Sequence, residues 1–116
     1  MDAEVRRVFE QGLGDAEVVS ISWENYDLLL DLLLPGDPEE YLGLRFTEIA
    51  RLRIDIDFGN YVGKPLLFSA EVQEAKTRWK VIFNFGAAPD GSIKFECNDI
   101  NLRTPRPKAS DDHSGA

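Results

Sequence analysis

The feature that most constrains the fold is a strict two-residue alternation of apolar and charged side chains over residues 51–58. One set comprises Leu52, Ile54, Ile56 and Phe58, and the other comprises Arg51, Arg53, Asp55 and Asp57. Successive side chains of a β-strand point to opposite faces, so this pattern predicts a strand with a buried face and a solvated one. Such a strand needs partners, and the rest of the chain should supply the remainder of a sheet.

Several other segments have strand patterns. Alternation or β-rich composition marks residues 17–23, 42–46, 68–73, 78–85 and 93–102. Residues 28–34 carry leucine at every position except Asp31, and periodicity cannot separate a helix from a strand buried on both faces there. We favour a strand, because the prolines of the segment 35–38 stop the run after about two helical turns at most.

The connections are short. Residues 47–50 are expected to form a bend, and the sequence Pro-Asp-Gly-Ser at 89–92 predicts a tight turn that closes a hairpin. In the last strand the inward positions Ile93, Phe95 and Cys97 are followed by Ile100, three positions later instead of two. This change of phase predicts a β-bulge at Asn98 and Asp99.

The N-terminal residues have helical spacing. Val5, Val8, Phe9 and Leu13 recur on one side, with Asp2 as the expected N-cap and Gly12 as the expected end. Together the elements predict an α+β domain that is predominantly antiparallel β. We expect a meander of about six or seven strands, either open or curled into a half-barrel, with one short N-terminal helix. Residues 1–104 should form this single domain, and residues 105–116 a flexible tail.

The chain is acidic. Its 116 residues include 21 Asp and Glu against 13 Lys and Arg, a formal net charge of −8. This charge disfavours binding to nucleic acid and to anionic membranes, whereas it favours encounter with a basic protein. Cys97 is the single cysteine, so no intrachain disulfide forms. No export signal or membrane-length apolar run is present, and the expected location is the cytoplasm.

Catalytic chemistry has few candidates in this sequence. The single histidine, His113, falls in the expected tail, and Cys97 lies on the inward phase of its strand. Nucleophilic catalysis needs a base within hydrogen-bond reach, and a zinc site needs more Cys or His ligands. Asp55 and Asp57 share their face with arginines, as on a solvated surface. We therefore expect a protein that is not an enzyme and that uses no cofactor or metal.

The aromatic residues with inward phase are expected in the core: Trp23, Phe58, Trp79, Phe83, Phe85 and Phe95.

Two acidic segments supply the candidate partner-binding residues. Three tyrosines fall at breaks, and one of them follows a run of acids, which suits a protein-recognition surface. The predicted contacts are Asp37, Glu39, Glu40 and Tyr41 in one segment and Asp55 and Asp57 in the other.

Over residues 15–103 the order of elements resembles that of small immunity proteins of bacterial polymorphic toxin systems. The resemblance is carried by the strand patterns VVSISW (18–23), LRFTEI (44–49), LRID (52–55), WKVIF (79–83) and GSIKFECNDINL (91–102). It implies a non-enzymatic protein that neutralises a cognate toxin in the producing cell, with the acids meeting a basic toxin surface. The alternatives are a small-ligand carrier, with Trp79, Phe83 and Phe85 lining a curled sheet, and a subunit that oligomerises through strand edges. The oligomeric state stays open.

Overall fold

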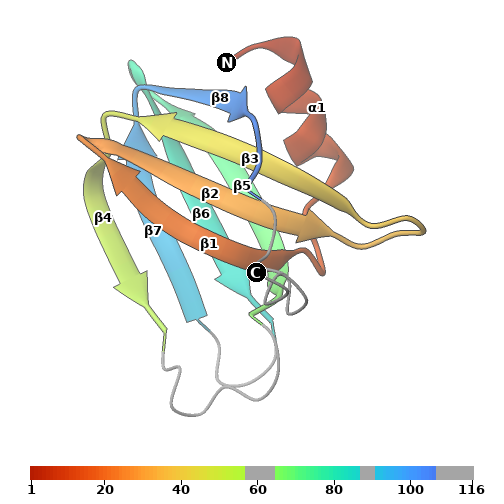
Figure 1. The fold of residues 1–116 in the computed structure, drawn as a ribbon. Coiled ribbons are helices and arrows are strands. Elements are labelled where there is room, and N and C mark those ends of the chain that lie inside the picture. The colour runs from red at the N-terminus through yellow and green to blue at the C-terminus, as the bar shows by residue number, and fades with distance from the viewer. Residues whose placement is uncertain (57–64, 87–90, 107–116) are drawn as a thin grey trace, which may run out of the picture.

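The computed structural model describes residues 1–56, 65–86 and 91–106 (Figure 1). Within these ranges it contains one helix and eight strands. They are α1 (Ala3–Gln11), β1 (Glu17–Glu24), β2 (Asp27–Leu34), β3 (Glu40–Thr47), β4 (Ala50–Asp55), β5 (Leu67–Ala75), β6 (Arg78–Phe85), β7 (Gly91–Cys97) and β8 (Asp99–Arg103).

The strands form two four-stranded sheets in the described part of the chain. Sheet A has the order β1-β2-β3-β8 and sheet B the order β4-β7-β6-β5, and the neighbouring strands pair antiparallel. The predicted mostly antiparallel β domain with one short N-terminal helix is confirmed. A single meander of six or seven strands is not what forms, because the strands divide between two sheets and do not close into a barrel within the described residues.

The chain changes sheet at one corner, where two connections run side by side. One lies between β3 and β4, the other between β7 and β8, and the N–H of Asn98 donates to the Thr47 carbonyl across 2.8 Å. The predicted bulge at Asn98 and Asp99 is therefore wrong. The change of phase in the sequence marks the point where the chain leaves sheet B, and Ile100 enters the core again from sheet A.

The leucine-rich segment is a strand, as predicted. β2 pairs with β1 on one edge and with β3 on the other. Leu28, Leu30 and Leu32 face the interior, while Leu29 and Asp31 are buried on the opposite face. Burial on both faces explains why the segment does not alternate.

The two sheets pack through an aromatic centre. The Phe46 ring on β3 makes edge-to-face contacts with Phe83 on β6 and Phe95 on β7, at centroid distances of 5.9 and 5.0 Å. Edge-to-face pairs of this kind add to the stabilisation from burial of the rings. All three side chains are buried.

Helix α1 packs at the side of the molecule where β8 and β5 end the two sheets (Figure 1). The Asp2 side chain accepts a hydrogen bond from the Val5 N–H at 3.0 Å, and Gly12 ends the helix with φ of 91°. Both predicted helix ends are confirmed. No helix in the described ranges has the length and apolar character needed to cross a membrane.

Strand β4 differs from its prediction. Its register shifts between Ala50 and Arg53, where Arg51 has φ of 54°. Leu52 and Ile54, expected inside, are 38% and 53% exposed. Both side chains are exposed because β4 is an edge strand, which pairs only with β7 among the described strands. Phe58 and Asp57 lie outside the described residues.

Candidate functional site

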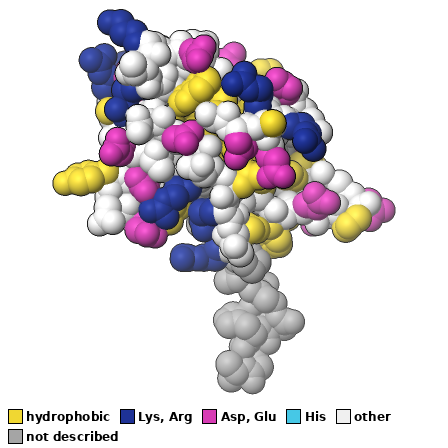
Figure 2. Space-filling view, turned by 90° about the horizontal axis from the view of Figure 1, so that it is seen from above, with side chains coloured by type: hydrophobic (Ala, Val, Ile, Leu, Met, Phe, Trp, Pro, Cys, Tyr) yellow, Lys and Arg dark blue, Asp and Glu magenta, His cyan; other side chains and the backbone are white. Residues whose placement is uncertain are grey.

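The first predicted contact segment lies at the tip of the β2–β3 hairpin, which projects from the body of the molecule (Figure 1). Asp37, Glu39 and Glu40 are exposed there, and Tyr41 is 38% exposed. None of the three carboxylates forms an ion pair with another described residue. In Figure 2 the same projecting part carries acidic and hydrophobic side chains. The tip is thus an uncompensated negative surface with an aromatic residue at its base.

The second predicted segment lies elsewhere. Asp55 is exposed at the end of β4, opposite Ser92 of β7, and β4 lies on the other side of the molecule from the hairpin tip (Figure 1). The fold therefore does not bring Asp55 together with the acids of the hairpin. Arg51 on the same strand lies 3.8 Å from the Glu96 carboxylate, so part of this charge pattern is a surface ion pair.

Two aromatic residues lie exposed at the surface of the sheets. Trp23, expected in the core, is 52% exposed, because β1 is an edge strand of sheet A. Phe68, for which the sequence gives no core prediction, is 74% exposed at a register shift of β5 between Leu67 and Ser69. A local bulge and an edge position leave no clear trace in apolar periodicity, so the sequence did not indicate either exposed ring.

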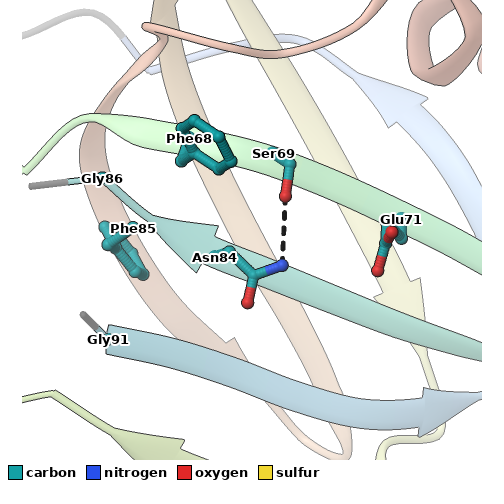
Figure 3. Close-up of a pocket in the computed structure, with 7 residues that line it drawn as sticks. All are labelled: Phe68, Ser69, Glu71, Asn84, Phe85, Gly86 and Gly91. Carbon is teal, nitrogen blue, oxygen red and sulfur yellow. Dashed lines mark hydrogen bonds between the residues drawn. The ribbon is translucent and has the colours of Figure 1, made fainter.

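Phe68 borders a pocket on sheet B (Figure 3). The pocket has a volume of about 570 Å³, and its described lining consists of Phe68, Ser69, Glu71, Asn84, Phe85, Gly86 and Gly91. The Asn84 amide donates to the Ser69 hydroxyl at 3.0 Å, and this pair separates the exposed Phe68 ring from the Glu71 carboxylate. The pocket combines an apolar wall with polar groups, as small-molecule sites do.

Among the described residues, the most buried carboxylate belongs to Asp31, on the outer face of β2. It accepts hydrogen bonds from the Ser20 hydroxyl at 2.6 Å, from the Arg103 guanidinium at 2.7 Å and from the Arg106 N–H at 2.9 Å. Burial by itself would raise the pKa of Asp31, but these hydrogen bonds and the Arg103 charge together lower it below its usual value. The charged carboxylate thus holds the segment after β8 on sheet A. Arg106, expected in the tail, takes part in this contact, and residues 107–116 lie outside the described part of the chain.

Cys97 is fully buried on β7, opposite Trp79 of β6. Burial raises the pKa of its thiol to about 12, and the nearby charge of Arg78 offsets only part of the effect. A thiol with this pKa carries almost no thiolate at neutral pH. Among the described residues no three His, Cys, Asp or Glu side chains gather in a metal-binding arrangement.

Comparison of the chain with known protein families, with curated proteins and with solved structures gives no match.

Proposed function

We propose that this chain is a non-enzymatic protein-binding module, most concretely an immunity-type protein that neutralises a cognate bacterial toxin through an acidic surface. The observation that supports this proposal best is the β2–β3 hairpin tip. Its three exposed carboxylates have no ion-pair partner among the described residues, and the hairpin that carries them projects from the body of the molecule.

The geometry of the tip suits a basic, concave partner surface. Opposite charges speed the encounter, and an aromatic residue beside them provides apolar contact area. Tyr41 pairs with Leu33 across the hairpin, so the strands hold its position. A rigidly presented aromatic loses little conformational freedom when a partner covers it.

The test uses the protein encoded next to the gene for this chain. Co-expression should relieve any growth inhibition that the neighbouring protein causes, and the two purified proteins should bind. The variant Asp37→Lys/Glu39→Lys/Glu40→Lys should weaken this binding and flatten its salt dependence. A matched variant, Glu4→Lys/Glu10→Lys/Glu74→Lys, changes the charge equally on α1 and β5 and should have a smaller effect.

Two results contradict the proposal. Absence of both rescue and binding would exclude toxin neutralisation for that pair. Equal effects of the two triple variants would show that the hairpin tip is not the contact and that only net charge matters.

A second candidate function is the binding of a small ligand, in the pocket beside Phe68. The exposed ring, with the Glu71 carboxylate and the Ser69–Asn84 pair, suits a ligand with a flat apolar face and hydrogen-bond donors. Of the three aromatics first expected to line an interior site, Phe83 and Phe85 are buried and Trp79 is half-buried. A fragment screen by NMR should show shifts at Ser69 and Asn84 that disappear in Phe68→Ala.

A further inference from the structure

The four sheet edges of this fold differ in how they are protected. Proteins protect edge strands by shortness, by charge, by bulges or by a covering element, because an unprotected edge pairs with other chains. β8 has five residues, and α1 packs beside both β8 and β5. β5 also carries exposed Glu71 and Glu74, while β4 carries a bulge and three charged residues.

β1 has less protection than the other three. It has eight residues, and its charges lie only at its ends, on Glu17 and Glu24. Its one bulge lies near its start, between Val18 and Ser20. The four residues that follow the bulge, from Ser20 to Trp23, form an uncharged edge.

Among the described strands, none pairs with the outer edge of β1 along this part. Within the described residues, the contacts of the outer edge of β1 lie at the start of the strand. Glu17 forms a β-bridge with Leu66, and the Val18 N–H donates to the Pro65 carbonyl at 2.9 Å. A two-residue turn of Asn25 and Tyr26 joins β1 to β2. The pair next to this turn, Glu24 and Asp27, is therefore a pair whose backbone groups hydrogen-bond to each other. Alternation along the strand then directs the N–H and C=O groups of Ile21 and Trp23 toward the free edge.

The side chains beside these groups are apolar and half-exposed. Ile21 lies opposite Leu30 and Trp23 opposite Leu28, so both are on the core-facing side of sheet A, yet they are 38% and 52% exposed. Tyr26 in the adjoining turn is 80% exposed. An added strand would extend the core face by covering Ile21 and Trp23 with its own apolar residues.

The net charge of the chain favours a basic partner segment over a second copy of this chain. A second copy of this chain would bring another −8 against this one. In antiparallel pairing it would also bring its own strand-end acids to an edge that already ends in Glu17 and Glu24, and like charges in such positions are destabilising. A segment with lysine or arginine at alternate positions would instead place its cations on the outer face beside Glu24, whose carboxylate is 57% exposed although Arg45 lies 3.3 Å from it.

We infer that the free edge of β1 binds an extended, basic segment of a partner protein as an additional strand of sheet A, an inference that rests on the proposed protein-binding function. The backbone of Ile21 and Trp23 would supply the hydrogen bonds, and their side chains the apolar contact. This is a strand-addition mode of recognition, in which the main chain provides affinity and alternate side chains provide specificity.

The test uses the full chain and a synthetic peptide, Lys-Val-Lys-Val-Lys-Val-Lys. Binding should slow amide hydrogen exchange at Ile21 and Trp23, the residues directed to the free edge, and should shift the Trp23 emission to shorter wavelength. Ser22, already paired with β2, should change little. The acidic peptide Glu-Val-Glu-Val-Glu-Val-Glu should not bind.

The matched variants are Ile21→Pro and Ile21→Thr. Proline removes one free-edge N–H and is tolerated in an edge strand, whereas threonine keeps the N–H and loses a similar apolar contact. Peptide affinity should fall roughly tenfold further in Ile21→Pro than in Ile21→Thr, as expected for a lost hydrogen bond with a steric clash. Circular dichroism confirms that both variants are folded.

Three results overturn the inference. One is equal affinity of Ile21→Pro and Ile21→Thr for the basic peptide, and another is the absence of saturable binding. The third is a dimer, seen by sedimentation equilibrium and lost only in Ile21→Pro, since the edge would then bind a second copy. If the neighbouring gene product binds equally to both variants, strand addition at β1 is wrong while the proposed protein-binding function stands.

Discussion

The Arg103 guanidinium at the end of β8 lies 2.7 Å from the Asp31 carboxylate in the middle of β2, although β3 separates the two strands in sheet A. The contact is made across the outer face of the sheet. It is possible because the residue between them in the sheet, Gly43, pairs with both Asp31 and Arg103 and has no side chain. Ser20 and the Arg106 N–H complete the shell around the carboxylate.

Replacement of Asp31 should be costly. Asp31→Asn removes the charge that pairs with the largely buried Arg103, and we expect a loss of about 3 kcal/mol in the free energy of unfolding. Urea denaturation at neutral pH measures this loss. The exposed Asp55→Asn is the control and should change stability by less than about 0.5 kcal/mol. Equal losses in the two variants would show that the Asp31 network contributes little.

The same network makes stability depend on pH. The pKa of Asp31 is lowered in the folded state, so the folded protein binds fewer protons than the unfolded chain as the pH falls below about 4, where an ordinary Asp titrates. The stabilisation is therefore complete at neutral pH and is lost on acidification. We expect the stability advantage of the wild type over Asp31→Asn to shrink below about pH 4. A constant difference across the acid range would contradict this assignment.

Asp27 should add to the acid sensitivity. A hydrogen bond from the Glu48 N–H is the main cause that lowers the pKa of Asp27, and contact with Arg45 lowers it further. The variant Asp27→Asn should flatten the pH dependence of the urea midpoint below about pH 4. If Asp27→Asn and the wild type show the same slope, the carboxylate is not linked to folding.

Gly43 should not tolerate a side chain. A Cβ at this position would lie 2.7 Å from the Arg103 carbonyl oxygen and 2.9 Å from the Pro105 Cα, so the backbone after β8 would have to move. We expect Gly43→Ala to lose about 1–3 kcal/mol of stability and to accelerate tryptic cleavage after Arg103. Gly14→Ala is the control, because its Cβ would lie 3.4 Å from its nearest neighbour. Unchanged cleavage in Gly43→Ala would mean that the segment is not held against this glycine.

The Cys97 thiol should react very slowly with thiol reagents in the folded protein. Because burial raises the pKa of its thiol to about 12, a thiol reagent such as DTNB should react with the native protein far more slowly than with the chain in concentrated guanidinium chloride. The reaction rate at mildly alkaline pH measures this difference. Rapid reaction in the native state would show that β7 opens at this position.

Much of the local structure follows from short-range patterns. The Asp2 cap and Gly12 end define α1, and the leucine run stopped by Pro35 defines β2, because capping and chain-breaking chemistry act over a few residues. The exposed acids of the β2–β3 tip were likewise predictable, since a turn rich in Pro, Gly and acids reaches solvent in most folds.

Other features depended on contacts between distant segments. Alternation predicts that Leu52, Ile54 and Trp23 have an inward face, but whether that face is covered depends on which strands end a sheet, and β4 and β1 do. The separation of the hairpin acids from Asp55 also depends on which sheet each strand joins.

By itself, then, the sequence determined most of the strand segments, where α1 begins and ends, and the acidic surface. Only the tertiary structure decided that the strands form two sheets, that the chain crosses between them at Asn98, and that Asp31 meets Arg103. The physical reason is range: backbone propensity and side-chain alternation are properties of neighbouring residues, whereas sheet edges and the Asp31 network join residues as many as 75 positions apart.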